Sequence, residues 1–322
     1  MNLKKSKHRL IPTANMSREE WLAQRKHTIG GSDAAGIVGL SKWSSPYSVW
    51  ADKTGRLPEK EDSEAMRLGR DLEDYVARRW MEATGMKCRR LNAMIYNSDY
   101  PFAHADIDRE VIGENAGLEC KTTSDLDVRQ FFDCEFPVKY YCQCVHYMAV
   151  TGADRWYLAV LVFGKGFFTY CLERNEGIQN EIDHLMDAER DFWRYVASDT
   201  PPAADDSEAT SDALGAIYAD SAPGKIELSG KSGLLREREI LRQQKSEIEK
   251  RIRGIDNELK ASLGGFETGV AGDWRVTWKP QERRTLREDL LLRDYPDIGS
   301  LADYYETNTT RVLRVKKIDR GA

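Results

Sequence analysis

Apolar residues recur along the first 200 residues with periods that switch between helix-like and strand-like. Leu68, Leu72, Val76 and Trp80 are four residues apart. This spacing predicts an amphipathic helix over 63–85. The other predicted elements are a helix over 34–40 that Ser32 or Asp33 caps, strands over 91–97, 102–112 and 117–122, a helix over 137–150, strands over 156–163 and 167–173, and a helix over 175–197. Their order predicts a mixed α/β domain over residues 1–200.

A proline-rich stretch, Thr200-Pro201-Pro202, marks the end of this domain. We interpret residues 201–230 as a linker and 231–322 as a C-terminal extension. In the extension Leu234, Leu241, Ile248 and Ile255 recur every seven residues, which predicts one long helix with a coiled-coil-like seam. A small hairpin over 269–279 and a basic tail from residue 310 follow. The seam could pair with another subunit or fold back onto the first domain.

Composition narrows the class of protein without naming its function. The net charge of −5 argues against a protein that coats DNA nonspecifically, but a DNA enzyme needs only a local basic patch. No apolar run approaches the roughly 20 residues of a membrane span. The basic segment 1–10 is followed by no apolar stretch, so we expect no secretory signal and a cytoplasmic location.

The predicted hairpin over 102–122 gathers charged residues. Side chains alternate along a strand, so Glu119 and Lys121 share one face, as do Asp106 and Asp108. A two-residue turn at residues 113–114 places Asp108 opposite Glu119 and Asp106 opposite Lys121. A four-residue loop over 113–116 places Asp108 opposite Lys121 instead. Either register brings three or four charged groups within reach of one another.

Two neighbouring carboxylates repel each other unless a cation lies between them. Mg²⁺ is such a cation, and the backbone carbonyl of Cys120 offers it a further oxygen ligand beside Asp108 and Glu119. The metal would polarise a phosphodiester while Lys121 orients a water molecule or stabilises developing negative charge. The alternative is an ordinary pair of surface salt bridges on an exposed sheet face.

Three further positions extend the candidate site. Glu73 falls within the apolar stripe of the helix over 63–85, and lining a cleft is the less costly explanation for a carboxylate there. Gln143 and Tyr147 are four residues apart on the helix over 137–150 and share a face. Gln143 could bind a scissile phosphate or water, or be an ordinary polar residue. Arg25 and the helix cap ending in Ser32 suit a phosphate.

With these residues assembled, the chain resembles the YqaJ-like viral recombinase family, relatives of lambda exonuclease among the PD-(D/E)xK nucleases. The matching segments are Arg25-Lys26 with Ile29-Gly30-Gly31-Ser32-Asp33-Ala34-Ala35, Gly69-Arg70 with Leu72-Glu73, Asp106-Ile107-Asp108, Gly117-Leu118-Glu119-Cys120-Lys121-Thr122, and Gln143 with His146-Tyr147-Met148. They cover about residues 20–197 in order.

The resemblance implies a restriction-endonuclease-like core, a mixed central sheet flanked by helices, and catalysis with Mg²⁺ or Mn²⁺. It implies that Asp108 and Glu119 hold the metal and that Lys121 is catalytic. Glu73 and Gln143 would then complete the pocket.

The resemblance also implies that Arg25 and Ser32 receive a 5′-phosphate. Relatives digest one strand of duplex DNA from the 5′ end and hand the 3′ strand to a single-strand-annealing partner, and some form a trimeric ring. The extension over 231–322 departs from a minimal nuclease and leaves the oligomeric state open. An endonuclease, or a noncatalytic DNA-binding scaffold for recombination, would keep the same fold.

Overall fold

A computed structural model describes most of the chain, and its described part divides into two compact units. The described residues are 1, 3, 6–59, 62–124, 131, 136–221, 223–282 and 287–295. The first unit covers Met1–Ala219, and the second begins at Asp220. The predicted basic tail from residue 310 lies outside the described residues. Among the described residues, no helix combines the length and apolar character that crossing a membrane requires.

The first unit alternates helices and strands. Its helices are α1 (Arg18–Lys26), α2 (Gly31–Ile37), α3 (Pro46–Lys53), α4 (Glu64–Thr84), α6 (Val138–Thr151), α7 (Glu176–Ala197) and α8 (Glu208–Ile217). Its strands are β1 (His8–Pro12), β2 (Ile29–Gly30), β3 (Cys88–Arg89), β4 (Ala93–Asn97), β5 (Ala103–Ala105), β6 (Arg109–Val111), β7 (Ala116–Thr123), β8 (Arg155–Val162) and β9 (Gly166–Glu173). The predicted mixed α/β character is confirmed.

Local capping explains where the long helices begin and end. The Ser63 side chain accepts a hydrogen bond from the Met66 backbone N–H at the start of α4, and Gly85 ends the helix with a φ of 73°. Asn175 caps α7 in the same way as Ser63 caps α4. Such side-chain oxygens satisfy N–H groups that have no partner within the helix, and glycine adopts the left-handed conformation at no steric cost.

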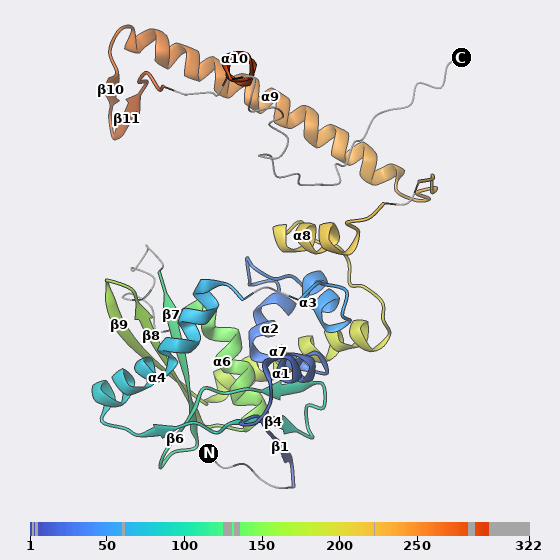
Figure 1. Cartoon of the computed structure of the whole chain (residues 1–322), viewed down its shortest axis with the longest axis vertical. Helices are drawn as coiled ribbons and strands as arrows, with labels where there is room; N and C mark the ends of the chain where they lie inside the picture. Colours follow the sequence, from blue (N-terminus) through green and yellow to red (C-terminus); the bar gives the residue numbers. More distant parts are fainter. Residues whose placement is uncertain are drawn as a thin grey trace. The chain divides into compact units, whose positions relative to one another are not determined.

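The strands of the first unit form two sheets (Figure 1). The larger sheet has the order β3-β6-β7-β8-β9, and the smaller has the order β1-β4-β5-β2. In the larger sheet β7 is antiparallel to β6 and parallel to β8. Helix α4 packs on one face of β7 and β8, whereas α6 packs on the other face and contacts the smaller sheet as well. The two sheets therefore meet around α6.

The prediction of one strand over 102–112 is wrong. The segment contains β5, which belongs to the smaller sheet, and β6, which belongs to the larger sheet. Residues 106–108 are in neither strand and carry the chain from one sheet to the other. A uniform alternation of side chains could not reveal this change of sheet, because both halves are extended and mostly buried.

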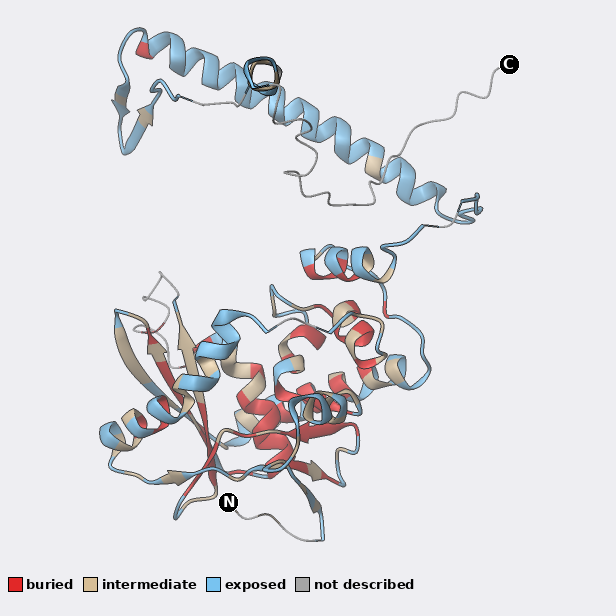
Figure 2. Cartoon of the chain, viewed as in Figure 1, coloured by how far each residue is buried: buried red, intermediate tan, exposed pale blue. Residues whose placement is uncertain are grey.

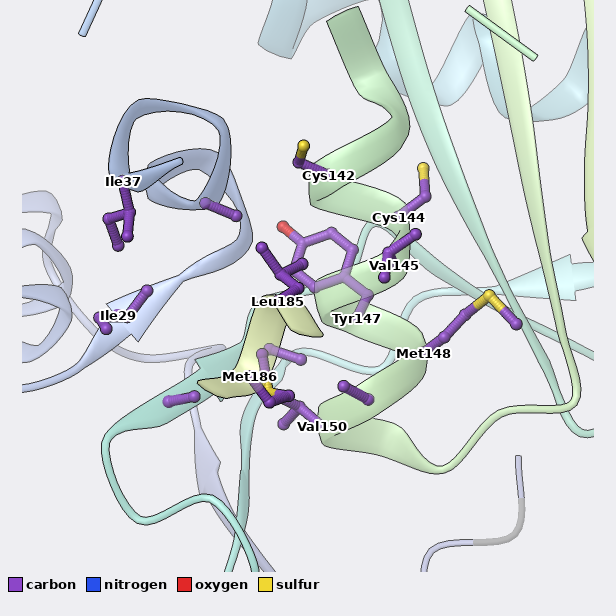
Figure 3. Packing of buried hydrophobic residues seen from close by; sticks show 14 of the residues in the cluster. Ile29, Ile37, Cys142, Cys144, Val145, Tyr147, Met148, Val150, Leu185 and Met186 are labelled. Carbon is purple, nitrogen blue, oxygen red and sulfur yellow. The ribbon is translucent and has the colours of Figure 1, made fainter. Parts of the chain in front are cut away.

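Helix α6 is the centre of the main core (Figures 2 and 3). Nine of its residues are buried, from Cys142 to Thr151, and they include Val145, Met148 and Val150. Because α6 contacts α2, α7 and both sheets, it is apolar on almost every side. A second, smaller core lies between α4 and the sheet around Trp80. The fold thus fixes α6 against β8, the direct neighbour of β7, which is the strand that carries the candidate chemistry.

The structure also contains a helix in the segment that the sequence suggested as a linker. Helix α8 packs against α3 within the first unit, and the Thr210 hydroxyl donates a hydrogen bond of 2.7 Å to the Ser45 hydroxyl. Both of these side chains belong to buried residues. Helical structure of the first unit therefore continues beyond residue 200.

The second unit contains the predicted long helix and small hairpin. Helix α9 (Ser232–Leu263) ends at Gly264, and strands β10 (Thr268–Ala271) and β11 (Trp274–Thr277) pair as an antiparallel hairpin. A short helix, α10 (Glu288–Asp294), follows. Most residues of α9 are exposed (Figure 2), and Leu263 is the only buried residue of this helix.

Candidate active site

The hairpin β6–β7 brings two predicted carboxylates together. Arg109 pairs with Leu118 in the ladder, which is the register of the two-residue turn. Asp108 directly precedes this ladder and is level with Glu119. Its Oδ2 atom accepts a hydrogen bond of 2.7 Å from the Cys120 backbone N–H. The change of sheet at residues 106–108 therefore turns Asp108 toward β7.

Strand alternation decides which side chains of β7 enter the site. Leu118 and Cys120 pack in the core under α4. Glu119 and Lys121 point to the opposite face, toward α6. The Lys121 Nζ atom lies 2.6 Å from Glu119 Oε1, and the Glu119 side chain is 3% exposed. The two charged groups form a largely buried ion pair.

Helix α6 supplies the two polar residues that the spacing predicted. The Gln143 side-chain amide donates hydrogen bonds to Glu119 Oε1 at 2.6 Å and to the Tyr147 hydroxyl oxygen at 3.0 Å. Tyr147 is buried and lies against α2, where a Cβ atom on Gly31 would be 2.6 Å from its ring. A glycine at position 31 is therefore required for this close approach.

Helix α4 places Glu73 at the edge of the site next to a buried arginine. The Arg109 guanidinium donates hydrogen bonds to Glu73 Oε1, to Asp74 Oδ1 at 2.5 Å and to the Asp108 carbonyl oxygen at 2.5 Å. The Arg109 side chain is only 4% exposed, and Arg90 lies 3.5 Å from the same Glu73 oxygen. The positive charges of Arg109 and Arg90 therefore balance the charge of the Glu73 carboxylate, and the hydrogen bonds of Arg109 fix the orientation of Glu73 relative to Asp108.

Helices α1 and α2 form the opposite wall. Arg25 donates a hydrogen bond of 2.5 Å to the Ser32 hydroxyl, and its guanidinium lies 4.6 Å from the centre of the Trp21 ring. The Trp21 indole N–H donates to Asp106 Oδ2 at 2.7 Å. The expectation that Asp106 pairs opposite Lys121 is wrong, because residue 106 precedes β6 and turns toward α1 instead.

The cap of α2 differs from the prediction. The N-cap is Gly30, whose N–H donates to Asp33 Oδ2 at 2.9 Å, rather than Ser32 or Asp33. The buried Lys53 ammonium lies 2.6 Å from the same Asp33 oxygen and donates to the Arg25 carbonyl oxygen at 2.9 Å. Burial alone would raise the pKa of Asp33, but Lys53 and Arg25 lower it to about 2. This ionised cluster fixes the backbone that carries Arg25 and Ser32.

Eight of the nine predicted site residues line one cavity of about 340 Å³. These eight are Arg25, Ser32, Glu73, Asp108, Glu119, Lys121, Gln143 and Tyr147. The ninth, Cys120, faces the other side of the sheet and contributes its backbone N–H. The lining also contains Trp21, Arg90, Asp106 and Arg109, so it carries four carboxylates and four cationic groups. The arrangement is polar, concave and charge-balanced.

Burial makes the two central carboxylates unusually hard to ionise. Burial raises the pKa of Asp108 well above its ordinary value, and the charges of Glu119 and Glu73 raise it further. Burial also raises the pKa of Glu119, although Lys121 opposes the shift. For Lys121, burial alone would lower the pKa, but Glu119 and Asp108 outweigh it and raise the pKa. Lys121 therefore stays charged, and ionisation of both carboxylates would place more negative charge here than Lys121 alone balances.

One buried oxygen points to the ligand that these carboxylates fit. Glu119 Oε2 is buried and has no hydrogen-bond partner within the described part of the chain. Among the described residues, no group of three His, Cys, Asp or Glu side chains forms a ready metal cluster. Asp108 and Glu119 alone match the one or two carboxylates by which proteins usually hold Mg²⁺, with other oxygens completing its shell. The residues present fit a magnesium or manganese ion.

Sequence reasoning missed Arg109, Trp21 and Lys53. Arg109 directly follows Asp108 in the sequence, and this position next to a candidate metal ligand could have indicated it. Trp21 and Lys53 offered no such signal, because each reaches the site from a separate helix through the tertiary fold.

Comparison with known proteins places the chain in a family. Residues 20–154 match the model of the YqaJ-like viral recombinase domain. The chain is also 36% identical over 295 residues to the uncharacterized protein YqaJ of Bacillus subtilis (strain 168), covering 90% of this chain and 92% of that relative. The chain belongs to the YqaJ-like viral recombinase family. All eight cavity-lining site residues named above fall within the matched segment of this viral recombinase domain.

Solved structures with weaker similarity include an alkaline exonuclease. The crystal structure of LHK-Exo in complex with dAMP aligns with a TM-score of 0.47 at 20% identity, covering 56% of this recombinase-family chain and 93% of the other. A second structure of this alkaline exonuclease, from Laribacter hongkongensis, has a TM-score of 0.44 and the same identity and coverage.

Proposed function

We propose that this YqaJ-family protein is a metal-dependent deoxyribonuclease that degrades one strand of duplex DNA from the 5′ end. The first unit would be a restriction-endonuclease-like PD-(D/E)xK domain. The observation that carries this proposal is the buried pair Asp108 and Glu119, which shares one cavity with the charged Lys121. Two buried carboxylates beside one lysine would leave a negative charge that a divalent ion can balance, and carboxylates with such perturbed pKa values cluster at functional sites.

Asp108 and Glu119 would hold a Mg²⁺ or Mn²⁺ ion, with the backbone carbonyl oxygen of Cys120 as a third candidate ligand. When bound, that ion would polarise a scissile phosphodiester and lower the pKa of a water molecule. The cavity lining as described is balanced between four carboxylates and four cations, so a divalent ion would make it net positive. A net positive cavity attracts the phosphate backbone of DNA.

Lys121 would act on the reacting phosphate. Its ammonium is held next to the carboxylates and stays protonated, so it can stabilise negative charge that develops during cleavage. Gln143 fixes the carboxylate of Glu119 through one amide hydrogen and the Tyr147 hydroxyl through the other. Glu73 is fixed by Arg109 and completes the acidic wall. Each of these side chains is already oriented before DNA binds.

Arg25 and Ser32 would bind the 5′-terminal phosphate. Their side chains lie in contact on the wall of the same cavity, and a guanidinium with a neighbouring hydroxyl is a strong pair of donors for phosphate. The ring of Trp21 packs against the Arg25 guanidinium in a cation–π contact. A phosphate held here would set the distance between the DNA end and the cleaved bond.

The product of such a reaction is a duplex with a 3′ single strand. We propose a single-strand-annealing protein as the recipient of that strand, and the cytoplasm as the location. An endonuclease would use the same residues but would not need a DNA end.

The deciding experiment is digestion of a linear duplex labelled at either the 5′ or the 3′ end, with Mg²⁺ or with EDTA. We expect early release of the 5′ label, retention of the 3′ label on a long strand, survival of covalently closed circles, and no cleavage in EDTA. Asp108→Asn should abolish the activity. The matched control is Asp71→Asn, because Asp71 lies on the exposed side of α4 and outside the cavity.

Each alternative has its own result in this assay. Cleavage of closed circles would establish an endonuclease. Equal activity of Asp108→Asn and the wild type would remove the proposed metal site. Binding of duplex ends without any cleavage, in Mg²⁺ and in Mn²⁺, would favour a noncatalytic scaffold.

A further inference from the structure

Helix α9 carries an apolar seam that the described residues of its own unit leave exposed. Leu241, Ile248 and Ile255 are 57%, 56% and 59% exposed, and the one buried residue of the helix, Leu263, lies at its end. Gly269 of the hairpin packs there, because a Cβ on it would be 2.9 Å from Leu263. A stripe of exposed apolar residues along a 32-residue helix is normally covered by another surface.

The seam follows the heptad pattern of a coiled coil. The d positions are Leu234, Leu241, Ile248 and Ile255, and the a positions are Arg238, Lys245, Ile252 and Leu259. The C-terminal half of the seam is therefore apolar at every a and d position from Ile248 to Leu259. Single polar residues at a positions weaken a coiled coil but fix its register. In a parallel, in-register pair Arg238 and Lys245 would each meet the same residue of the second copy, so the N-terminal half of the seam would contribute less to pairing than the C-terminal half.

The charges beside the seam indicate what covers it. Glu237 and Arg251 occupy g positions, and Arg242 and Asp256 occupy the e positions five residues later. Residues five apart on one helix do not face each other, and none of these four forms an ion pair within the described part of the chain. In two parallel helices each g position meets the e position five residues later on the other helix. Both pairs are then of opposite charge, Glu237 with Arg242 and Arg251 with Asp256.

Other arrangements of two copies are less favourable. An antiparallel pair that brings Ile248 against Ile252 also brings Glu249 against Glu249 of the second copy, and Arg251 against Arg251. Both contacts would be repulsive, and they offset the attraction between Arg242 and Asp256 of the second copy, which also meet in this arrangement. The charges at the e and g positions therefore favour the parallel, in-register orientation, in which both flanking pairs are attractive.

We propose that α9 binds the same helix of a second copy of this chain, in parallel and in register. This self-association does not depend on the proposed nuclease activity. It would hold at least two active sites in one particle, so that a second site is close to the DNA when the first releases it.

The test is the mass of the full-length chain in solution, measured by light scattering during gel filtration at low salt. We expect twice 36.8 kDa or a higher multiple of this mass. The variant E237R/R251E makes both pairs repulsive and should weaken self-association by roughly tenfold or more. The fourfold variant E237R/R242E/R251E/D256R exchanges the charges and should restore the mass.

A matched control isolates the seam from general effects of charge. E239R/R253E makes the same exchange at two b positions on the outer face of α9, and it should leave the mass unchanged. A wild-type mass of one chain at all concentrations overturns the proposal and indicates that α9 folds back. Failure of the fourfold variant to restore the mass, or an equal effect of the control, overturns the parallel register.

Discussion

Replacing Lys121 by methionine tests the electrostatics of the site by a quantity other than activity. Methionine keeps most of the length of the side chain and removes its charge. At an effective dielectric constant of about 20, two charges about 3 Å apart attract each other by about 6 kcal/mol, and desolvation of both groups offsets much of this. Removing one partner of a buried pair costs about 3–5 kcal/mol, because the other charge stays buried.

The surroundings of Lys121 indicate a loss of stability at the lower end of this range of about 3–5 kcal/mol. Lys121 is about a quarter exposed, and Gln143 still donates a hydrogen bond to Glu119 in the variant. We therefore expect Lys121→Met to lower the free energy of unfolding by about 3 kcal/mol. In the double variant Lys121→Met/Glu119→Gln no buried charge remains at this position, so most of the lost stability should return.

The assay is urea unfolding followed by circular dichroism, at pH 7.5 in EDTA so that divalent ions do not contribute. Lys87→Met serves as the control, because Lys87 is an exposed lysine outside the cavity, and it should change stability by less than about 0.5 kcal/mol. Both site variants should lack nuclease activity although the double variant is stable. A loss below about 1 kcal/mol in Lys121→Met, or no recovery in the double variant, would refute the description of a buried ion pair.

Three further predictions test other parts of the site. Arg25→Ala should remove the preference for 5′-phosphorylated over 5′-hydroxyl duplex ends in a competition digest, and an equal loss on both ends would contradict the phosphate assignment. Burial raises the pKa of Asp108 above its unfolded value, so its contribution to stability is complete below the ordinary carboxyl range near pH 4 and is lost as the pH rises. In EDTA, Asp108→Asn should therefore gain stability relative to the wild type as the pH increases, and an unchanged difference across the pH range would contradict the shift. Gly117→Ala should lower stability by about 1–3 kcal/mol, because the new Cβ would lie 2.3 Å from the Trp156 ring, whereas the open position Gly215 should tolerate alanine; equal unfolding midpoints for both variants would contradict the packing.

The sequence predicted most elements of the first unit because each one has its own local pattern. Apolar residues four apart predict the helix over 63–85, and a glycine marks its end. The structure contains α4 at this position. The strands on either side of residues 164–166 are likewise present as β8 and β9. The short strands β2 and β3 were not predicted, because two residues are too few to show a period. The long strand over 102–112 was wrong for a different reason, because an extended segment shows no sign in sequence of the sheet it joins.

The chain by itself therefore determined which residue types are available for chemistry and which of them share a face. The spacing of Glu119 and Lys121 placed them together, and the spacing of Gln143 and Tyr147 did the same on the helix. Only the tertiary structure decided that these two faces meet, that Asp106 turns away to Trp21, and that a buried Arg109 neutralises Glu73. Local periodicity is a property of neighbouring residues, whereas burial and pKa depend on groups that the fold brings from distant parts of the chain.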